Sequence, residues 1–197
     1  MNEKLIFFSA FIKNFKTIGS IIPSSKFLAK RVSQTIKDLN VENKVILEIG
    51  AGTGVFSREL LKSNEIKSLD VIEMNNNFFK YLFKLKDQNP HKIPLNIHFI
   101  NFFTHKTPRK YSIVLSGVPL NLLSPKDFDN FLDRTADLLT DDGFFVFFEY
   151  LNSPLLSLKN NKLNKLRKKR VLKKIEVKNF PPAQIVVVPS SEIKNVL

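Results

Sequence analysis

The chain contains no cysteine and has few histidines. The absence of cysteine excludes disulfide bonds and thiolate metal sites. The three histidines, His91, His98 and His105, lie in one short stretch of the chain. A metal site would require them to converge. We therefore interpret them as scattered surface residues and expect no metal.

Long apolar runs are also missing. No stretch of the sequence is apolar for long enough to span a bilayer. The apolar residues near the N-terminus are interrupted by Lys4, Lys13 and Lys16, and a small-residue cleavage site is lacking. This pattern does not fit a secretory signal peptide, so we expect a cytoplasmic protein.

Positive charge is what the chain has in excess. Lysine and arginine total 31 against 18 aspartates and glutamates, which gives a net charge of +13. Such an excess points to a polyanionic partner, either nucleic acid or an anionic membrane surface. The alternative is a bias toward lysine and asparagine that only keeps the protein soluble. The length of 197 residues and the hydrophobic content of 43% suit one domain with a core.

Short apolar runs alternate with helical patterns through most of the chain. The runs that predict buried strands are residues 44–49, 68–73, 95–102, 111–116 and 144–150. Helices are predicted between them, the last from Ser124-Pro125 to Asp141-Asp142-Gly143. Two further strand-like runs, 171–177 and 184–188, flank the turn Asn179–Pro182. The alternation predicts an α/β fold with a mostly parallel seven-stranded sheet, a C-terminal antiparallel strand pair and helices on both faces.

Two helical segments precede the first strand. Residues 3–16 predict an amphipathic helix with an aromatic face of Phe7, Phe8, Phe11 and Phe15. A turn follows, and a second helix runs to about Leu39. We expect residues 1–40 to form this N-terminal part and residues 41–197 to form the core of a single domain.

A glycine loop, Glu48-Ile49-Gly50-Ala51-Gly52-Thr53-Gly54, ends the first strand and begins a helix. Glycine has no side chain to keep a ligand away from the backbone. Glu73 ends the next strand, where a carboxylate can accept hydrogen bonds from both ribose hydroxyls of an adenine nucleoside. The same arrangement serves NAD, and a glycine turn that binds no ligand is the structural alternative.

Three features favour S-adenosylmethionine over NAD. The glycines alternate as E-x-G-x-G-x-G instead of G-x-G-x-x-G. Glu48 stands at the start of the loop, where a carboxylate can help to hold the amino group of the ligand. The predicted antiparallel pair at the end of the chain also differs from the parallel strands and substrate domain of a nicotinamide enzyme.

Residues 47–60, LEIGAGTGVFSREL, resemble motif I of class I methyltransferases. Residues 138–144 resemble the turn before the fifth strand of that family, with Asp141 and Asp142 in place of proline and glycine. Asn101-Phe102 stands where the family has an Asp-Ala pair, and Asn101 can still accept from the adenine amine through its side-chain oxygen. The resemblance implies a Rossmann-like fold with S-adenosylmethionine as cofactor. It assigns cofactor binding to Glu48, Gly50, Ala51, Gly52, Gly54, Glu73, Met74, Asn101, Phe102 and Ser116.

Three other segments are similar to bacterial phospholipid N-methyltransferases, which are related to the ribosomal RNA adenine dimethyltransferases. These segments are residues 11–25, Ser116-Gly117-Val118-Pro119-Leu120 and Asn179-Phe180-Pro181-Pro182-Ala183. Phe15 and Val186–Val188 depart from the proline and the aromatic residues of that family. The resemblance implies an amine-headgroup lipid, such as phosphatidylethanolamine, as the methyl acceptor. It places a substrate entrance at Gly19, Ser20, Pro23, Ser24 and Ser25.

An enzyme that acts on a lipid headgroup must dock on a membrane. The aromatic face of the 3–16 helix would enter the acyl boundary, and the basic stretch 159–174 would attract anionic lipid. We therefore expect a peripheral position on the inner face of the cytoplasmic membrane. The expected membrane contacts are Phe7, Phe8, Phe11, Phe15, Lys168, Lys169 and Arg170. The alternatives are a helix that packs its phenylalanines on the sheet and a basic loop that is only solvated.

The implied reaction is the attack of an amine nitrogen on a sulfonium methyl group, in which positioning supplies most of the rate. The amine must be neutral, so a nearby group must accept its proton or burial must lower its pKa. Ser116 ends the fourth strand, where it would face the methyl group, and Glu149 and Tyr150 end the fifth, so these three are the predicted catalytic residues. We predict Tyr150 as a headgroup contact and Glu149 as a proton acceptor, although only one of two adjacent strand residues can face the pocket.

Two other functions stay open from the sequence. An RNA adenine N6-methyltransferase fits the net charge. However, residues 116–120 hold no aromatic side chain to stack on a base, and we expect no extra helical domain of the kind that grips RNA. A cofactor-binding protein without catalysis is the other alternative, and it fits Asn101 and the altered turn at Asp141-Asp142-Gly143.

Overall fold

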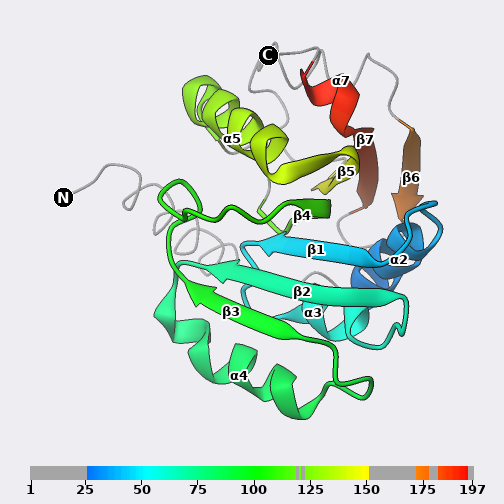
Figure 1. Ribbon diagram of the computed structural model, residues 1–197, viewed down its shortest axis with the longest axis vertical. Helices are drawn as coiled ribbons and strands as arrows, with labels where there is room; N and C mark the ends of the chain where they lie inside the picture. The colour runs from blue at the N-terminus through cyan, green and yellow to red at the C-terminus, as the bar shows by residue number, and fades with distance from the viewer. Residues whose placement is uncertain (1–25, 119, 121–122, 151–171, 178–181, 195–197) are drawn as a thin grey trace.

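The computed structural model describes residues 26–118, 120, 123–150, 172–177 and 182–194 (Figure 1). The predicted N-terminal helix, the turn at 19–25 and most of the basic stretch lie outside these residues. A seven-stranded sheet has the strand order β3-β2-β1-β4-β5-β7-β6. Its strands are β1 Lys44–Ile49, β2 Ile66–Glu73, β3 Leu95–Phe99, β4 Tyr111–Ser116, β5 Leu139–Tyr150, β6 Lys173–Val177 and β7 Ala183–Pro189.

The first five strands are parallel, and β1, β2 and β3 all end at the left of Figure 1. β7 pairs antiparallel with β5, and β6 pairs antiparallel with β7. The order reverses at β1, where β2 and β4 lie on opposite sides. Open α/β sheets bind ligands beyond the carboxyl ends of the strands at such a point. The predicted fold class is confirmed, including the antiparallel strands at the end of the chain.

Helices cover both faces of the sheet. They are α2 Lys26–Lys37, α3 Val55–Leu60, the 3-10 turn η1 Asn76–Phe78, α4 Phe79–Asp87, α5 Pro125–Leu138 and α7 Ser190–Lys194. α5 begins as predicted, because Ser124 Oγ accepts from the backbone N–H of Asp127 at 3.2 Å and a proline follows the cap. In the part of the chain that the structure describes, no helix has the length and apolarity to cross a membrane.

The sheet has an apolar core on each face. Side chains of successive strand residues point to opposite faces. On one face, Ile46 and Val71 belong to a core with residues of α2, α3 and α4. On the other, Leu47 and Ile72 belong to a core with residues of α5 and α7. The central strands are therefore apolar on both sides, as their unbroken runs predict.

Two predicted boundaries of the sheet are wrong. The helix predicted to continue to residues 141–143 ends at Leu138, and β5 begins at Leu139. Leu139 pairs with Tyr111 of β4, so strand pairing overrides the helical pattern. The third strand, predicted to reach residue 102, ends at Phe99 because the chain turns there. In this turn the carbonyl of Asn101 accepts from the N–H groups of Thr104 and His105.

The histidines are arranged differently from the prediction. His105 is buried, and its ring centroid lies 5.0 Å from that of His98. Burial lowers the pKa of His105, and the neighbouring His98 and Arg134 lower it further. Among the described residues, no three side chains of histidine, cysteine, aspartate or glutamate form a group that could hold a metal ion.

Candidate functional site

The glycine loop leaves β1 in the left-handed region of backbone space. The φ angle is +74° at Gly50 and +56° at Gly52, values that favour glycine. A Cβ atom on Gly50 would overlap the side chain of Val118, so the loop and the segment after β4 are in close contact. A Cβ atom on Gly52 would meet nothing within 4 Å. The backbone at Gly52 therefore borders open space that a ligand can occupy.

Glu73, at the end of β2, lies beside the glycine loop and holds it through a hydrogen bond. Its carboxylate accepts hydrogen bonds from the backbone N–H groups of Gly52 and Asn75, both at 2.8 Å. Burial raises the pKa of Glu73, and these backbone donors oppose the rise. A carboxylate accepts at about four positions, so capacity remains for ribose hydroxyls. The predicted ribose-binding acid thus lies next to the glycine loop.

A mostly apolar cavity lies where β1, β2 and β3 end. Its lining includes four of the predicted cofactor residues, Gly50, Met74, Asn101 and Phe102. Apolar walls with few polar groups are typical of sites for small molecules and cofactors. The cavity therefore suits a flat heterocycle with polar edges, and adenine is one.

Asn101 forms the polar edge of this cavity. Its Oδ1 accepts from the backbone N–H of Phe103 at 2.9 Å, and an amide oxygen can accept a second hydrogen bond. Arg134 of α5 donates from Nε to the carbonyl oxygen of Phe102 at 2.8 Å and lies over the Phe102 ring. The turn that lines the cavity is therefore held by α5 as well as by its own backbone.

Glu48 is fully buried and faces α3. It accepts a hydrogen bond from the hydroxyl of Ser57, and its Oε1 has no hydrogen-bond partner within the described residues. Burial raises its pKa from 4.5 to about 8, Ser57 opposes the rise and Glu73 adds to it. Glu48 is not among the residues that line the cavity. Its contact with the amino group of the cofactor stays a prediction, although a buried oxygen without a donor suits an ammonium group.

Ser116 and its neighbours pack on the glycine loop. The backbone N–H of Gly117 donates to the carbonyl of Ile49 at 2.8 Å. The hydroxyl of Ser116 donates to the carbonyl of Val118 at 2.9 Å and accepts from the N–H of Val118 at 3.2 Å. Ser116 therefore shapes the turn, and its part in catalysis stays a prediction.

β5 carries the other two predicted catalytic residues. Glu149 is buried and is the register partner of Gln184 in β7. It shares a face with Phe147, so it points to the side covered by α5. The side chain of Tyr150 lies outside the described residues. So do the entrance residues Gly19, Ser20, Pro23, Ser24 and Ser25, and the membrane residues Phe7, Phe8, Phe11, Phe15, Lys168, Lys169 and Arg170.

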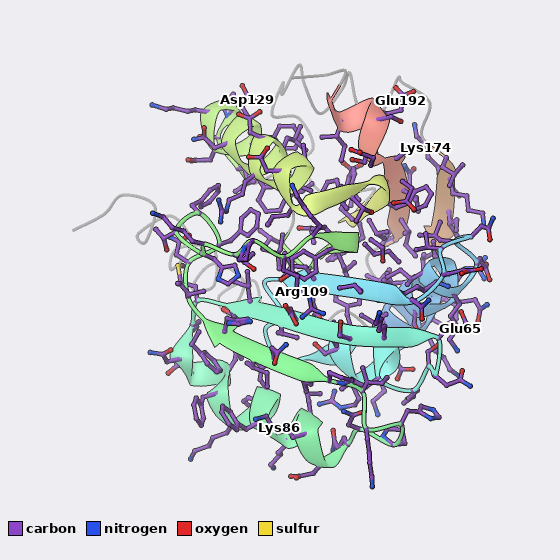
Figure 2. All side chains as sticks on the ribbon, viewed as in Figure 1. Glu65, Lys86, Arg109, Asp129, Lys174 and Glu192 are labelled. Carbon is purple, nitrogen blue, oxygen red and sulfur yellow. The ribbon has the colours of Figure 1, made fainter. Side chains whose placement is uncertain are left out.

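A polar cluster supports the strands below the cavity. Asp70 of β2 accepts from Arg109 Nη1 at 3.1 Å, from Asn96 Nδ2 at 2.8 Å and from the Tyr111 hydroxyl at 2.7 Å. Burial and the hydrogen bond to Asp70 raise the pKa of Tyr111, so its hydroxyl stays protonated. Figure 2 shows Arg109 over this part of the sheet. The cluster fixes β2, β3 and β4 relative to one another.

These residues fit S-adenosylmethionine. The cavity suits adenine, Glu73 suits the ribose, and Gly52, which donates to Glu73, has open space beside it. Sequence reasoning missed part of the cavity lining, namely Ile49, Ile72, Ile100, Phe103, Val118, Leu123 and Phe131. Only Ile49 and Val118 lie in segments that the sequence singled out. The others are aliphatic or aromatic residues whose pattern is the same as that of core residues.

A family model described as AdoMet dependent proline di-methyltransferase matches residues 13–192. Malonyl-[acyl-carrier protein] O-methyltransferase 2 of Ilyobacter polytropus is 25% identical over 137 residues, which cover 70% of this chain and 51% of that protein. The chain thus spans about half the length of this curated relative.

Solved structures share the fold at low sequence identity. N-methyltransferase NodS from Bradyrhizobium japonicum WM9, in complex with S-adenosyl-l-homocysteine, has a TM-score of 0.64 at 15% identity, over 82% of this chain and 86% of that chain. The 1,6-didemethyltoxoflavin-N1-methyltransferase from Burkholderia thailandensis has a TM-score of 0.71 at 13% identity, over 94% and 88% of the two chains. At these identities the likeness shows the fold alone.

Proposed function

We propose an acceptor for the methyl group on the premise that this chain belongs to the family of AdoMet-dependent proline di-methyltransferases. The chain is therefore an S-adenosylmethionine-dependent methyltransferase, and S-adenosylmethionine is its cofactor. The proposed acceptor is the amine nitrogen of a membrane-lipid headgroup, such as phosphatidylethanolamine. The enzyme would act on the inner face of the cytoplasmic membrane.

One observation carries this proposal. The Ser116-Gly117-Val118 segment, which resembles that of phospholipid N-methyltransferases, packs directly on the cofactor loop. Gly117 donates to Ile49, and Val118 fills the space beside Gly50. The segment that carries the acceptor resemblance is therefore in contact with the loop that carries the cofactor resemblance. The net charge of +13 also suits an anionic membrane surface.

The chain has to bind, orient and deprotonate the amine. The cofactor supplies a methyl group on a sulfonium, and the amine attacks it through its lone pair. A primary amine titrates near 10.4 in water, so most of it carries a proton that must first be lost. Glu149, buried at the end of β5, is the proposed proton acceptor, and Tyr150 is the proposed headgroup contact.

A proline nitrogen is the second candidate, because the matching family is described by proline dimethylation. A proline nitrogen inside a peptide bond is an amide and cannot carry two added methyl groups. The acceptor would therefore be free proline or a proline at the N-terminus of a peptide. Both candidates are aliphatic amines that must lose a proton, so the chemistry required of the enzyme is the same.

Methyl transfer from labelled S-adenosylmethionine to separate acceptors tests the proposal. The acceptors are phosphatidylethanolamine in vesicles with phosphatidylglycerol, a peptide that begins with proline, and ribosomal RNA. We expect label in phosphatidylethanolamine. Label only in the peptide would replace the lipid with proline, and label only in RNA would support an adenine methyltransferase. Binding of S-adenosylhomocysteine with no transfer to any acceptor would support a non-catalytic protein.

A further inference from the structure

Helix α4 exposes aromatic side chains that the core does not use. Its buried face consists of Leu82 and Leu85. Phe79, Tyr81 and Phe83 keep 48%, 52% and 40% of their surface exposed. Isolated exposed apolar residues are ordinary, but a contiguous group marks an interaction site.

Two of these aromatic residues, Phe79 and Phe83, form a cluster with Phe99 of the edge strand β3. The ring centroids of Phe79 and Phe83 are 4.1 Å apart, and that of Phe99 lies 5.2 Å from Phe79. Ile100 follows Phe99, is 36% exposed and lines the cofactor cavity. The apolar surface therefore extends from α4 to the edge of the cavity. α4 lies along β3 at the lower edge of Figure 1.

Positive charge surrounds the aromatic cluster. α4 has the sequence FKYLFKLKD, so Lys80, Lys84 and Lys86 alternate with apolar residues and Asp87 is the only acid. All three lysines are exposed, and Figure 2 shows Lys86 on this helix. The Lys86 Nζ lies 5.1 Å from the centre of the Phe83 ring. Lysines that flank aromatic rings can place their charges at lipid headgroups while the rings enter the acyl boundary.

We propose that the α4 surface, made of Phe79 and Phe83 with Lys80, Lys84 and Lys86, docks on an anionic phospholipid membrane. The inference deepens the proposed function, because a lipid acceptor requires a docked enzyme. It places a membrane contact in the folded core, apart from the N-terminal helix. The membrane surface would then lie beside the cavity that holds the cofactor.

Two other occupants fit the surface less well. Single-stranded RNA stacks its bases on free ring faces. Phe79 and Phe83 stack on each other at an interplanar angle of 22°, and Lys86 covers Phe83, which leaves few free faces. A second copy of the chain, paired α4 against α4, would bring the lysines of the two helices together. An anionic membrane satisfies both the rings and the charges.

The chain has no tryptophan, so the fluorescence of a single introduced tryptophan reports the surroundings of that residue alone. In Phe83→Trp, phosphatidylcholine vesicles with phosphatidylglycerol should shift the emission to the blue, and brominated acyl chains should quench it. Phe27→Trp is the matched control, because Phe27 is 54% exposed on α2. Its emission should not change. Quenching of the Phe27→Trp indole alone, or of neither indole, would overturn the proposal.

Vesicle sedimentation with a double variant gives a second measurement. Phe79→Ser with Phe83→Ser should weaken binding at least about tenfold, because two side chains no longer enter the bilayer. Phe27→Ser with Leu172→Ser is the control, since Leu172 is 52% exposed elsewhere. Equal losses in both double variants would overturn the proposal, as would loss of RNA binding by the α4 variant without loss of vesicle binding.

These measurements separate docking from methyl transfer. The vesicles contain no amine lipid, so docking succeeds or fails regardless of the acceptor. A shift in melting temperature on addition of S-adenosylhomocysteine shows that each variant keeps its folded cofactor site. Docking without any methylation of phosphatidylethanolamine in the acceptor assay would contradict the proposed function and leave the docking surface in place.

Discussion

The carboxyl end of the sheet has two halves that are built differently. In the cofactor half, β1 and β2 supply a loop held by backbone hydrogen bonds, with Gly50 donating to Ile72 and Gly52 to Glu73 at 2.8 Å each. In the half proposed to hold the acceptor, β4 and β5 supply single side chains such as Ser116 and Glu149. Backbone shape thus forms the cofactor site, whereas the proposed acceptor site depends on side chains from separate segments.

The largest effect is expected from Gly50→Ala, because Gly50 lies where the two halves are in contact. The new Cβ atom would overlap Val118, and φ is +74° at this position. Strain of roughly 1–2 kcal/mol together with the overlap should weaken S-adenosylhomocysteine binding about a hundredfold. Titration calorimetry measures the affinity.

A matched variant separates the overlap from the strain. Adding Val118→Ala to Gly50→Ala removes the methyl group that the new Cβ atom would meet. We expect part of the affinity to return. Unchanged affinity in Gly50→Ala would contradict close contact between the cofactor loop and the segment after β4.

Glu73→Gln should have the next largest effect. The amide keeps one acceptor oxygen but cannot accept from both Gly52 and Asn75 and also bind a ribose. We expect the affinity for S-adenosylhomocysteine to fall about tenfold or more, because hydrogen bonds to a charged group are lost. Glu42→Gln, on the exposed loop before β1, is the control and should not change the affinity. Equal effects of the two variants would refute the ribose contact.

Asn101→Asp tests whether position 101 accepts a hydrogen bond from the amine of adenine. The Asn101 oxygen already accepts from Phe103, and a carboxylate would keep that bond and offer a second acceptor. If an adenine amine donates to this position, the affinity should rise by about threefold, through a charge-assisted hydrogen bond. A fall in affinity would mean that the Asn101 amide donates to the ligand instead.

The smallest expected effect is that of Glu48→Gln on stability. Burial raises the pKa of Glu48 in the folded chain to about 8 from its ordinary value of 4.5. Because the unfolded chain loses this proton first, the free energy of unfolding should fall as the pH rises from 4.5 to 8. Glu48→Gln should remove that part of the pH dependence, which denaturant unfolding measures. The same slope in both proteins would contradict a protonated Glu48.

The sequence predicts the cofactor half well for a physical reason. Alternating glycines and an acid at the end of the next strand are local features, and the structure places Gly52 and Glu73 in direct contact. The parallel strands follow from the alternation of apolar runs with helices, whereas the strand order comes from the structure. The contacts that the sequence did not predict join residues that are far apart in the chain. Arg134 on α5 holds the cavity turn, and nothing in its spacing indicates this contact.

The errors have the same origin. The pattern of residues 138–143 predicts helix, but Leu139 finds a partner in β4 and becomes a strand residue. His98 and His105 are evenly spaced in sequence, yet the turn after β3 folds back and brings their rings together. The predicted roles of Glu48, Ser116, Glu149 and Tyr150 await measurement, because each depends on the position of a bound ligand.

One measurement tests the acceptor most directly. Vesicles of phosphatidylethanolamine and phosphatidylglycerol are incubated with the protein and with S-adenosylmethionine that carries a deuterated methyl group, and the lipids are then analysed by mass spectrometry. The proposed function predicts phosphatidylethanolamine that has gained one or more deuterated methyl groups. Unlabelled phosphatidylethanolamine, together with label in a peptide that begins with proline, would contradict it.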